Sequence, residues 1–260
     1  MDNLYNTILE KPFFILGPCV IESEELLDQV AQKLVEVQNN TNATIIFKAS
    51  FDKANRTSLK SFRGPGIEEG LKKLAAIKEK YGFSLTTDIH ESWQADIAKE
   101  VSDIIQIPAF LCRQTDLLVA AAKTGKIVNI KKAQFLSGED MIYPVEKVRD
   151  SGNTKLLLTE RGNMFGYNNL VVDFRNIADM KAFDIPVVMD CTHAVQRPGG
   201  NNGTTGGNRE FVPYMAKAAK AFGANGFFME VHPNPEIAKS DGPNMLFLDK
   251  VEAVVNSLLD

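Results

Sequence analysis

The chain has 260 residues, of which 44% are hydrophobic and 24% are charged, and its formal net charge is -4. These values are typical of a folded globular protein and exclude a disordered chain. The acidic balance also argues against a nucleic-acid-binding protein, so we expect no nucleic-acid partner.

Eight short runs of β-branched and aromatic residues recur along the chain, and each is a candidate for a buried strand. They occupy residues 13–17, 44–50, 83–89, 103–109, 126–132, 155–161, 186–193 and 226–232. Apolar residues at helical spacing lie between them, most clearly from Leu26 to Val37 and from Ile67 to Ile77, and the segments 114–124 and 209–222 are alanine-rich.

Strands that alternate with helices predict a parallel sheet, and eight such repeats in this length favour a closed barrel over an open sheet. No linker or charge run divides the chain. We therefore predict an α/β fold with one domain, residues 1–260, that forms a single (β/α)8 barrel, the TIM barrel, with parallel strands.

The segment RPGGNNGTTGGNRE, residues 197–210, differs from the rest of the chain in its glycine and asparagine content. It follows the seventh predicted strand, on the side of the barrel where such enzymes build their active sites. Two interpretations stay open for it, a mobile lid over the site and a solvated surface loop.

The N-terminus and the cysteines predict where the protein works. The segment MDNLYNTILEKPFFILGPC has an acidic residue near its start and only a short apolar run, so we expect no secretion signal and no membrane partner. The three cysteines, Cys19, Cys112 and Cys191, are too few for a disulfide framework. We therefore expect reduced thiols and a cytoplasmic protein.

Ionisable residues gather where the predicted strands run out into the following loops, which is where a barrel enzyme holds its site. All three histidines, His90, His193 and His232, belong to this set. The cations in it are Lys48, Lys53, Arg56, Arg63, Arg113, Lys131 and Arg161. Positive charge focused in an acidic protein predicts a substrate that carries phosphate or carboxylate groups. The alternative is a set of solvated surface cations.

A second set combines a thiol, an imidazole and two carboxylates. It consists of Cys19 after the first strand, His193 and Glu230 in the last two strands, and Asp241 in the final loop. Such a mixed set of donors suits a borderline divalent ion such as Zn²⁺, Mn²⁺, Fe²⁺ or Co²⁺. No local spacing tests this hypothesis, so a packed thiol for Cys19 and a hydrogen-bonded imidazole for His193 stay open.

Strand parity predicts that Glu230 and His232 share one face of their strand, and that Cys191 and His193 share one face of theirs. Parity does not say which face points inward. We interpret Cys112 and Cys191 as structural thiols, with a nucleophilic pair of Cys191 and His193 as the alternative.

The chain resembles a known family in motifs that run in order from about Phe13 to about Leu248. The motifs are FKASFDKANRTSLKSFRGPG, TTDIHES, IIQIPAFLCRQTDLL, NIKKAQFL, TERGNMFGYNNLVVDFR, DCTHAVQRPGG and MEVHPNPEIAKSDGPN. They are similar to those of the 3-deoxy-D-manno-octulosonate 8-phosphate synthases, also called 2-dehydro-3-deoxyphosphooctonate aldolases. The resemblance implies a homotetramer of barrels that condenses phosphoenolpyruvate with arabinose 5-phosphate, releasing phosphate, in the synthesis of the Kdo sugar of lipopolysaccharide.

The resemblance also implies a substrate site, residue by residue. The residues that would hold phosphoenolpyruvate are Lys48, Lys53, Gln106, Ala109, Lys131 and Arg161. Asn55, Arg56 and Thr57 would bind the sugar phosphate, with Arg113 reaching in from a neighbouring subunit. The family has KANRS where this chain has KANRT, and Thr57 keeps the hydroxyl group of that serine. We add His232, at the end of the eighth strand, to the substrate-binding set.

The family has a metal-dependent and a metal-free class. The metal-free class has asparagine where this chain has Cys19, so the resemblance implies the metal-dependent class, with a divalent ion on Cys19, His193, Glu230 and Asp241. The segment SDGPN around Asp241 is similar to both classes, and the assignment therefore depends on Cys19.

The expected mechanism is an aldol-type condensation in which C3 of phosphoenolpyruvate attacks the sugar aldehyde, water attacks C2, and phosphate leaves a tetrahedral intermediate. Lys53, Lys131 and Arg161 would stabilise the shifting charge, and the ion would orient the aldehyde or activate the water. Asp88 and His90 are the candidates for catalytic proton transfer.

Two alternatives remain for the function. The related 3-deoxy-arabino-heptulosonate 7-phosphate synthases share the phosphoenolpyruvate half of the site but have GTRP where this chain has KANR. A barrel that only binds sugar phosphates would need the cations but not the thiol, imidazole and carboxylates.

Overall fold

The computed structural model describes residues 2–166, 169–201 and 204–260. Eight parallel strands close into a barrel, because β1 pairs with β2 on one side and with β12 on the other. In order around the barrel they are β1 (Phe13–Gly17), β2 (Thr44–Lys48), β3 (Ser84–Asp88), β4 (Ile104–Ile107), β5 (Ile127–Lys131), β6 (Leu156–Glu160), β9 (Val187–Asp190) and β12 (Gly226–His232). The predicted (β/α)8 barrel with parallel strands is confirmed.

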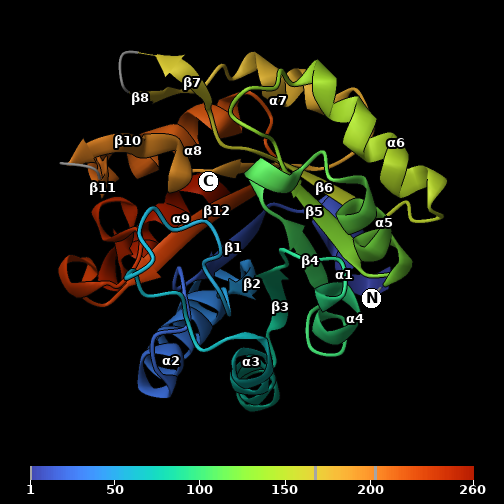
Figure 1. Cartoon of the computed structure of the whole chain (residues 1–260). Helices are drawn as coiled ribbons and strands as arrows, with labels where there is room; N and C mark the ends of the chain where they lie inside the picture. The colour runs from blue at the N-terminus through green and yellow to red at the C-terminus, as the bar shows by residue number, and fades with distance from the viewer. Residues whose placement is uncertain (1, 167–168, 202–203) are drawn as a thin grey trace.

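A helix follows each barrel strand and covers its outer face, as Figure 1 shows with the strands at the centre and the helices around them. These helices are α2 (Glu24–Thr41), α3 (Ile67–Tyr81), α4 (Gln94–Ala98), α5 (Thr115–Lys123), α6 (Ile142–Asp150), α7 (Arg175–Lys181), α8 (Val212–Ala221) and α9 (Val251–Leu259). The first and eighth strands have the predicted bounds. Others are shorter: β2 ends at Lys48 and β9 at Asp190, before the ends predicted at residues 50 and 193.

The barrel interior is apolar at its amino end and polar at its carboxyl end. The buried apolar residues inside it are Ile8, Phe13, Ile15, Ile46, Ile104, Ile127, Leu157, Val188 and Phe228. Because alternate residues of a strand face the same side, the next inward positions after Ile46, Val188 and Phe228 are Lys48, Asp190 and Glu230. The apolar filling therefore ends where the ionisable residues begin.

Several elements were not predicted. Helix α1 (Asp2–Glu10) places Ile8 in the interior cluster, with Leu4 and Tyr5 packed against it. Strands β7 (Asn163–Gly166) and β8 (Asn169–Val171) form an antiparallel hairpin, and β13 (Leu246–Phe247) extends the sheet beside β12. The strand pieces are too short to show an apolar periodicity. Helix α1 does have apolar residues at helical spacing, Leu4 and Ile8, but over only 9 residues.

The glycine-rich segment after β9 is not an irregular loop. It forms a second antiparallel hairpin from β10 (Gln196–Asn201) and β11 (Thr204–Gly207), which stands outside the barrel in Figure 1. Residues 202 and 203 of this segment, for which a lid and a surface loop were both left open, lie outside the described residues. No described helix combines the length and apolar character that a membrane crossing requires.

Replacing Leu157 by alanine tests the interior packing. Leu157 is 0% exposed, so Leu157→Ala is expected to lower the free energy of unfolding by about 2–5 kcal/mol, as transfer and cavity terms add. Chemical denaturation at one protein concentration measures the change. Leu59 is fully exposed, and Leu59→Ala is expected to change stability by less than about 0.5 kcal/mol. Equal losses in the two variants would contradict this account of the core.

Candidate active site

The segment that carries Cys19 is tied to the end of β2. The backbone N–H of Ser50 and the ammonium of Lys48 both donate to the carbonyl oxygen of Cys19, at 3.3 and 3.0 Å. The N–H of Ile21 donates to the carbonyl of Ser50 at 3.0 Å. Gly17 allows the close approach, because a Cβ there would lie 2.0 Å from the carbonyl oxygen of Lys48. These contacts place the Cys19 side chain inside the molecule, 1% exposed.

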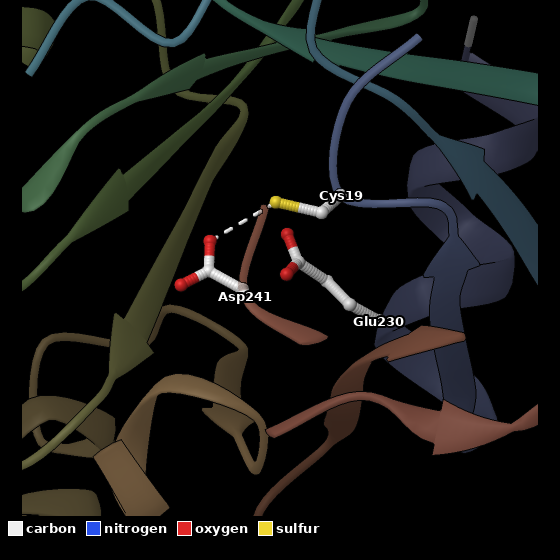
Figure 2. Close-up of side chains that lie close together, drawn as sticks. All are labelled: Cys19, Glu230 and Asp241. Carbon is white, nitrogen blue, oxygen red and sulfur yellow. Dashed lines mark hydrogen bonds between the residues drawn. The ribbon is translucent and has the colours of Figure 1, made fainter. Parts of the chain in front are cut away.

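Cys19, Glu230 and Asp241 converge although they lie far apart in the sequence. One donor atom from each lies within 4.8 Å of the other two, and Figure 2 shows the three side chains pointing toward one another. The thiol of Cys19 donates to Oδ2 of Asp241 at 3.0 Å. Asp241 has φ of 52°, in the left-handed region that aspartate tolerates better than most residues. Three of the four predicted metal ligands therefore share one place.

His193, the fourth predicted ligand, lies beside this cluster. Its Nε2 is 3.8 Å from Oε2 of Glu230 and 4.0 Å from Oδ2 of Asp241. Its Nδ1 faces the carboxylate of Asp190, at 2.8 Å from Oδ2, and a carboxylate only accepts hydrogen bonds. When the imidazole is neutral, the Nδ1–H tautomer follows, and the Nε2 lone pair then faces the cluster, as in carboxylate–histidine–metal arrangements.

A hydrogen-bonded chain holds Asp241 from the other side. The side chain of Gln196 donates from Nε2 to Oδ1 of Asp241 at 2.8 Å and accepts from Arg161 at 2.8 Å. Ser240 also donates to Oδ2 of Asp241, at 3.1 Å. Gln196, Ser240 and Asp190 were not predicted as site residues. Only for Asp190 was there a signal, because it is an ionisable residue in the carboxyl half of the predicted strand 186–193.

The ionisation of the cluster follows from burial and from its neighbours. Burial, together with Glu230 and Asp241, raises the pKa of the Cys19 thiol well above its usual value, although Lys53 and Lys48 oppose this. Burial alone would raise the pKa of Asp241, but His193 and Lys53 hold it below its ordinary value. The pKa of Glu230 is likewise lowered despite burial, by Lys53, His193 and Lys48. At neutral pH the cluster therefore contains two carboxylates and a protonated thiol.

The cluster fits a divalent ion. Oε2 of Glu230 is buried and has no hydrogen-bond partner among the residues that the structure describes. A buried carboxylate oxygen without a donor is unfavourable, so it needs a water or an ion. The donors around it are sulfur, imidazole nitrogen and carboxylate oxygen, the set that suits zinc or a neighbouring transition metal.

Four predicted substrate cations lie at the same end of the barrel. Lys48, Lys131 and Arg161 are buried, and the side chain of Lys53 is 11% exposed. Nζ of Lys131 lies 2.6 Å from Oδ2 of Asp190 and 3.9 Å from the centroid of the Phe228 ring. Nζ of Lys53 lies 3.8 Å from Oε1 of Glu230. Such buried positive charge favours binding of anions.

The ionisation of two of these lysines differs. Burial alone would lower the pKa of Lys53, but the carboxylates of Glu230 and Asp88 raise it well above its usual value. Burial lowers the pKa of Lys131, only partly opposed by Asp190. Lys53 is therefore the more firmly held charge of the two.

The other predicted residues have varied surroundings. Gln106 and Ala109 are buried, and Arg56 donates to Oγ of Ser240 at 2.7 Å. Nδ1 of His232 accepts from the backbone N–H of Asn234 at 3.0 Å, and the ring is buried. The exposed members are Asn55, Thr57, Arg63 and Arg113. Of these, Arg63 pairs with Asp52.

The parity prediction for Cys191 and His193 is wrong. Strand β9 ends at Asp190, and His193 begins a 3₁₀ turn, so the alternation of a strand no longer applies there. Cys191 packs in the outer core and its thiol faces the carbonyl of Met189, whereas His193 faces Asp190. The alternative of a nucleophilic pair of Cys191 and His193 is therefore wrong as well.

A closed parallel barrel that gathers cations, carboxylates, a thiol and imidazoles at its carboxyl end is the arrangement of a barrel enzyme. The chain belongs to the DAHP synthetase I family, whose sequence profile it matches over residues 9–259.

Close relatives share one name, 2-dehydro-3-deoxyphosphooctonate aldolase. The protein of that name from Cyanothece sp. is 55% identical over 250 residues, which cover 96% of this chain and 92% of the relative. The one from Fusobacterium nucleatum is 54% identical over 246 residues, covering 95% and 88%. The one from Campylobacter jejuni is 52% identical over 263 residues, covering 97% of each. The family resemblance found in the motifs is confirmed.

Proposed function

We propose that this chain condenses phosphoenolpyruvate with D-arabinose 5-phosphate and water to give 3-deoxy-D-manno-octulosonate 8-phosphate and phosphate, in Kdo and lipopolysaccharide biosynthesis. The relatives named 2-dehydro-3-deoxyphosphooctonate aldolase support this activity. The single structural observation that supports it most is the set of cations Lys48, Lys53, Lys131 and Arg161 gathered at one end of the barrel. Two phosphorylated substrates need such a set.

The residues divide the chemistry between them. Lys53, Lys131 and Arg161 stabilise the phosphate and carboxylate of phosphoenolpyruvate as charge shifts during attack by its C3 on the sugar aldehyde. Gln106 and Ala109 line the same ligand. Asn55, Arg56 and Thr57 hold the sugar phosphate. His232, the last residue of β12, also binds substrate. The Asp88 and His90 pair takes a proton when water adds at C2, before phosphate leaves.

The proposal includes a divalent ion held by Cys19, His193, Glu230 and Asp241. Zinc, manganese, iron and cobalt all suit these donors. A bound ion of this kind supplies Lewis acidity to the sugar aldehyde or to water. Asp190 orients the imidazole of His193, and Gln196 orients the carboxylate of Asp241, so this chain prepares two of the ligands by hydrogen bonds.

We also propose a cytoplasmic homotetramer. The three free, buried cysteines support a reducing compartment. Three large apolar side chains lie exposed on the loops that follow β4, β5 and β6: Phe110 at 57%, Phe135 at 57% and Phe165 at 93%. Exposed apolar groups on neighbouring loops indicate a contact surface, and a second copy there would bring Arg113 of that copy to the edge of the site.

The activity is tested by phosphate release. Purified protein is expected to release phosphate from phosphoenolpyruvate only when arabinose 5-phosphate is present. Lys131→Met is expected to lower kcat/KM by about 10²–10³-fold because it removes a cation aimed at developing charge, whereas Lys220→Met, at an exposed helix position, leaves it unchanged. Faster release with erythrose 4-phosphate would instead support the heptulosonate synthase that the family name suggests. Ligand binding without turnover would contradict both.

The metal is tested separately. Chelator-treated protein is expected to lose activity and to recover it with a divalent ion. Because the thiol of Cys19 must lose its proton to bind an ion, affinity is expected to fall as pH is lowered. Titration with Co²⁺ is expected to show sulfur-to-cobalt absorption in the near ultraviolet, absent in Cys19→Asn and retained in Cys112→Ala. Full activity after complete chelation, checked by elemental analysis, would contradict the proposed ion.

The assembly is tested by light scattering after size exclusion. The protein is expected to have four times the chain mass of 28.7 kDa. Phe110→Asp places a charge on the proposed contact surface and is expected to give smaller species with lower activity. Tyr214→Asp, on an exposed face of α8, is the control that stays tetrameric. A monomeric wild-type protein with full activity would contradict the tetramer.

A further inference from the structure

Ser50 is a buried residue at the centre of the site, and no role has been given to its side chain. It is 0% exposed and follows the last residues of β2. Its backbone holds the Cys19 segment through the two bonds described above. Its hydroxyl lies between the ammonium of Lys48, at 2.9 Å, and Oδ1 of Asp88, at a short distance.

The direction of these hydrogen bonds is determined by the groups themselves. An ammonium only donates, so the oxygen of Ser50 accepts from Lys48. The single hydroxyl proton of Ser50 then goes to Asp88. Burial alone would raise the pKa of Asp88, but the charge of Lys48 and the hydrogen bond from His90 hold it well below the ordinary value, so Asp88 is a carboxylate. The hydroxyl therefore fixes one oxygen of the Asp88 carboxylate.

The other oxygen of Asp88 determines the state of His90. Oδ2 lies 3.1 Å from Nε2 of His90, and a carboxylate only accepts, so Nε2 carries the proton. In the neutral imidazole the lone pair is then on Nδ1, an atom that is buried and has no hydrogen-bond partner in the described parts of the chain. The ring meets the Phe51 ring edge-on, with centroids 5.9 Å apart. An unpartnered lone pair in an enclosed place can accept a proton from a reacting group.

We propose that Ser50 is a positioning residue whose hydroxyl orients the Asp88 carboxylate and thereby selects the Nε2–H tautomer of His90, leaving Nδ1 as the proton acceptor of the reaction. This inference rests on the proposed function, because it deepens the role of Asp88 and His90 there. In this role Ser50 acts on His90 through Asp88, which its hydroxyl contacts directly.

The variant Ser50→Ala separates this role from that of the backbone, which keeps its bonds to the Cys19 segment. It is expected to lower kcat about tenfold and to change the KM of either substrate less than about twofold. Ser102→Ala is the matched control. Ser102 is also 0% exposed, its hydroxyl has no partner among the described residues, and it precedes β4 at the opposite end of the barrel. It is expected to leave kcat unchanged.

Nitrogen-15 NMR of histidine-labelled protein measures the tautomer of His90 independently of the reaction rate. The chain has only three histidines, so few signals must be assigned. The wild-type holoenzyme is expected to show His90, identified by its loss in His90→Gln, as Nε2–H, and Ser50→Ala is expected to populate Nδ1–H. An unchanged His90 signal in Ser50→Ala overturns the proposal whatever the rates are. If His90→Gln keeps full activity, the catalytic role of His90 fails, and the NMR signal still decides the role of Ser50.

A double-mutant comparison excludes a merely structural effect. If Ser50 acts through His90, Ser50→Ala lowers kcat in the wild-type background but has little effect in the His90→Gln background. The proposal is overturned if kcat of the double variant falls by the product of the two single losses.

Discussion

The buried ammonium of Lys48 is the contact on which the carboxyl end of the barrel depends. Its three protons go to three acceptors from different parts of the chain: the carbonyl of Cys19, the hydroxyl of Ser50 and Oε1 of Glu230 at 3.2 Å. The ammonium of Lys48 thereby connects the carboxyl ends of β1, β2 and β12. Removing the ammonium would take away the hydrogen-bond donor to Oε1 of the buried Glu230 and leave only Lys53 near it, at 3.8 Å, which is unfavourable for a buried carboxylate.

The same contact constrains how substrate can bind. Because every N–H of Lys48 already has an acceptor, a phosphate or carboxylate that approaches it must replace one of them. Lys53 and Lys131 are less fully occupied by the protein, and Lys53 lies 3.8 Å from Glu230. Lys53 lies beside Glu230 and Lys131 beside Asp190, so positive and negative groups are close neighbours in the site. This is what a phosphorylated substrate beside a divalent ion requires.

The fold and the outline of the site could be predicted from the sequence. Strand 13–17 and the first half of 226–232 are buried on both faces, so they consist of continuous apolar runs. The ionisable residues at the carboxyl ends of the strands belong to one rim by the geometry of a parallel barrel. The two hairpins could not be predicted this way, because their short strands pair with each other and have no apolar periodicity. Helix α1 has apolar residues at helical spacing, but nothing in its 9 residues indicates that it packs into the amino end of the barrel. His193 was placed on a strand face wrongly, because the point at which a strand ends depends on hydrogen bonds to its neighbours.

The order of residue types along the chain by itself determined the barrel, the polar end of its interior and the candidate residues Cys19, Glu230 and Asp241, because strand alternation and parallel order are properties of the local chain. Only the tertiary structure decided that those three donor atoms lie within 4.8 Å of one another, and that Asp190, Gln196 and Ser50 orient the groups around them. Hydrogen bonds between residues tens to hundreds of positions apart depend on distances and directions that no local pattern encodes. The functional side chains therefore follow from the sequence, but their alignment follows from the fold.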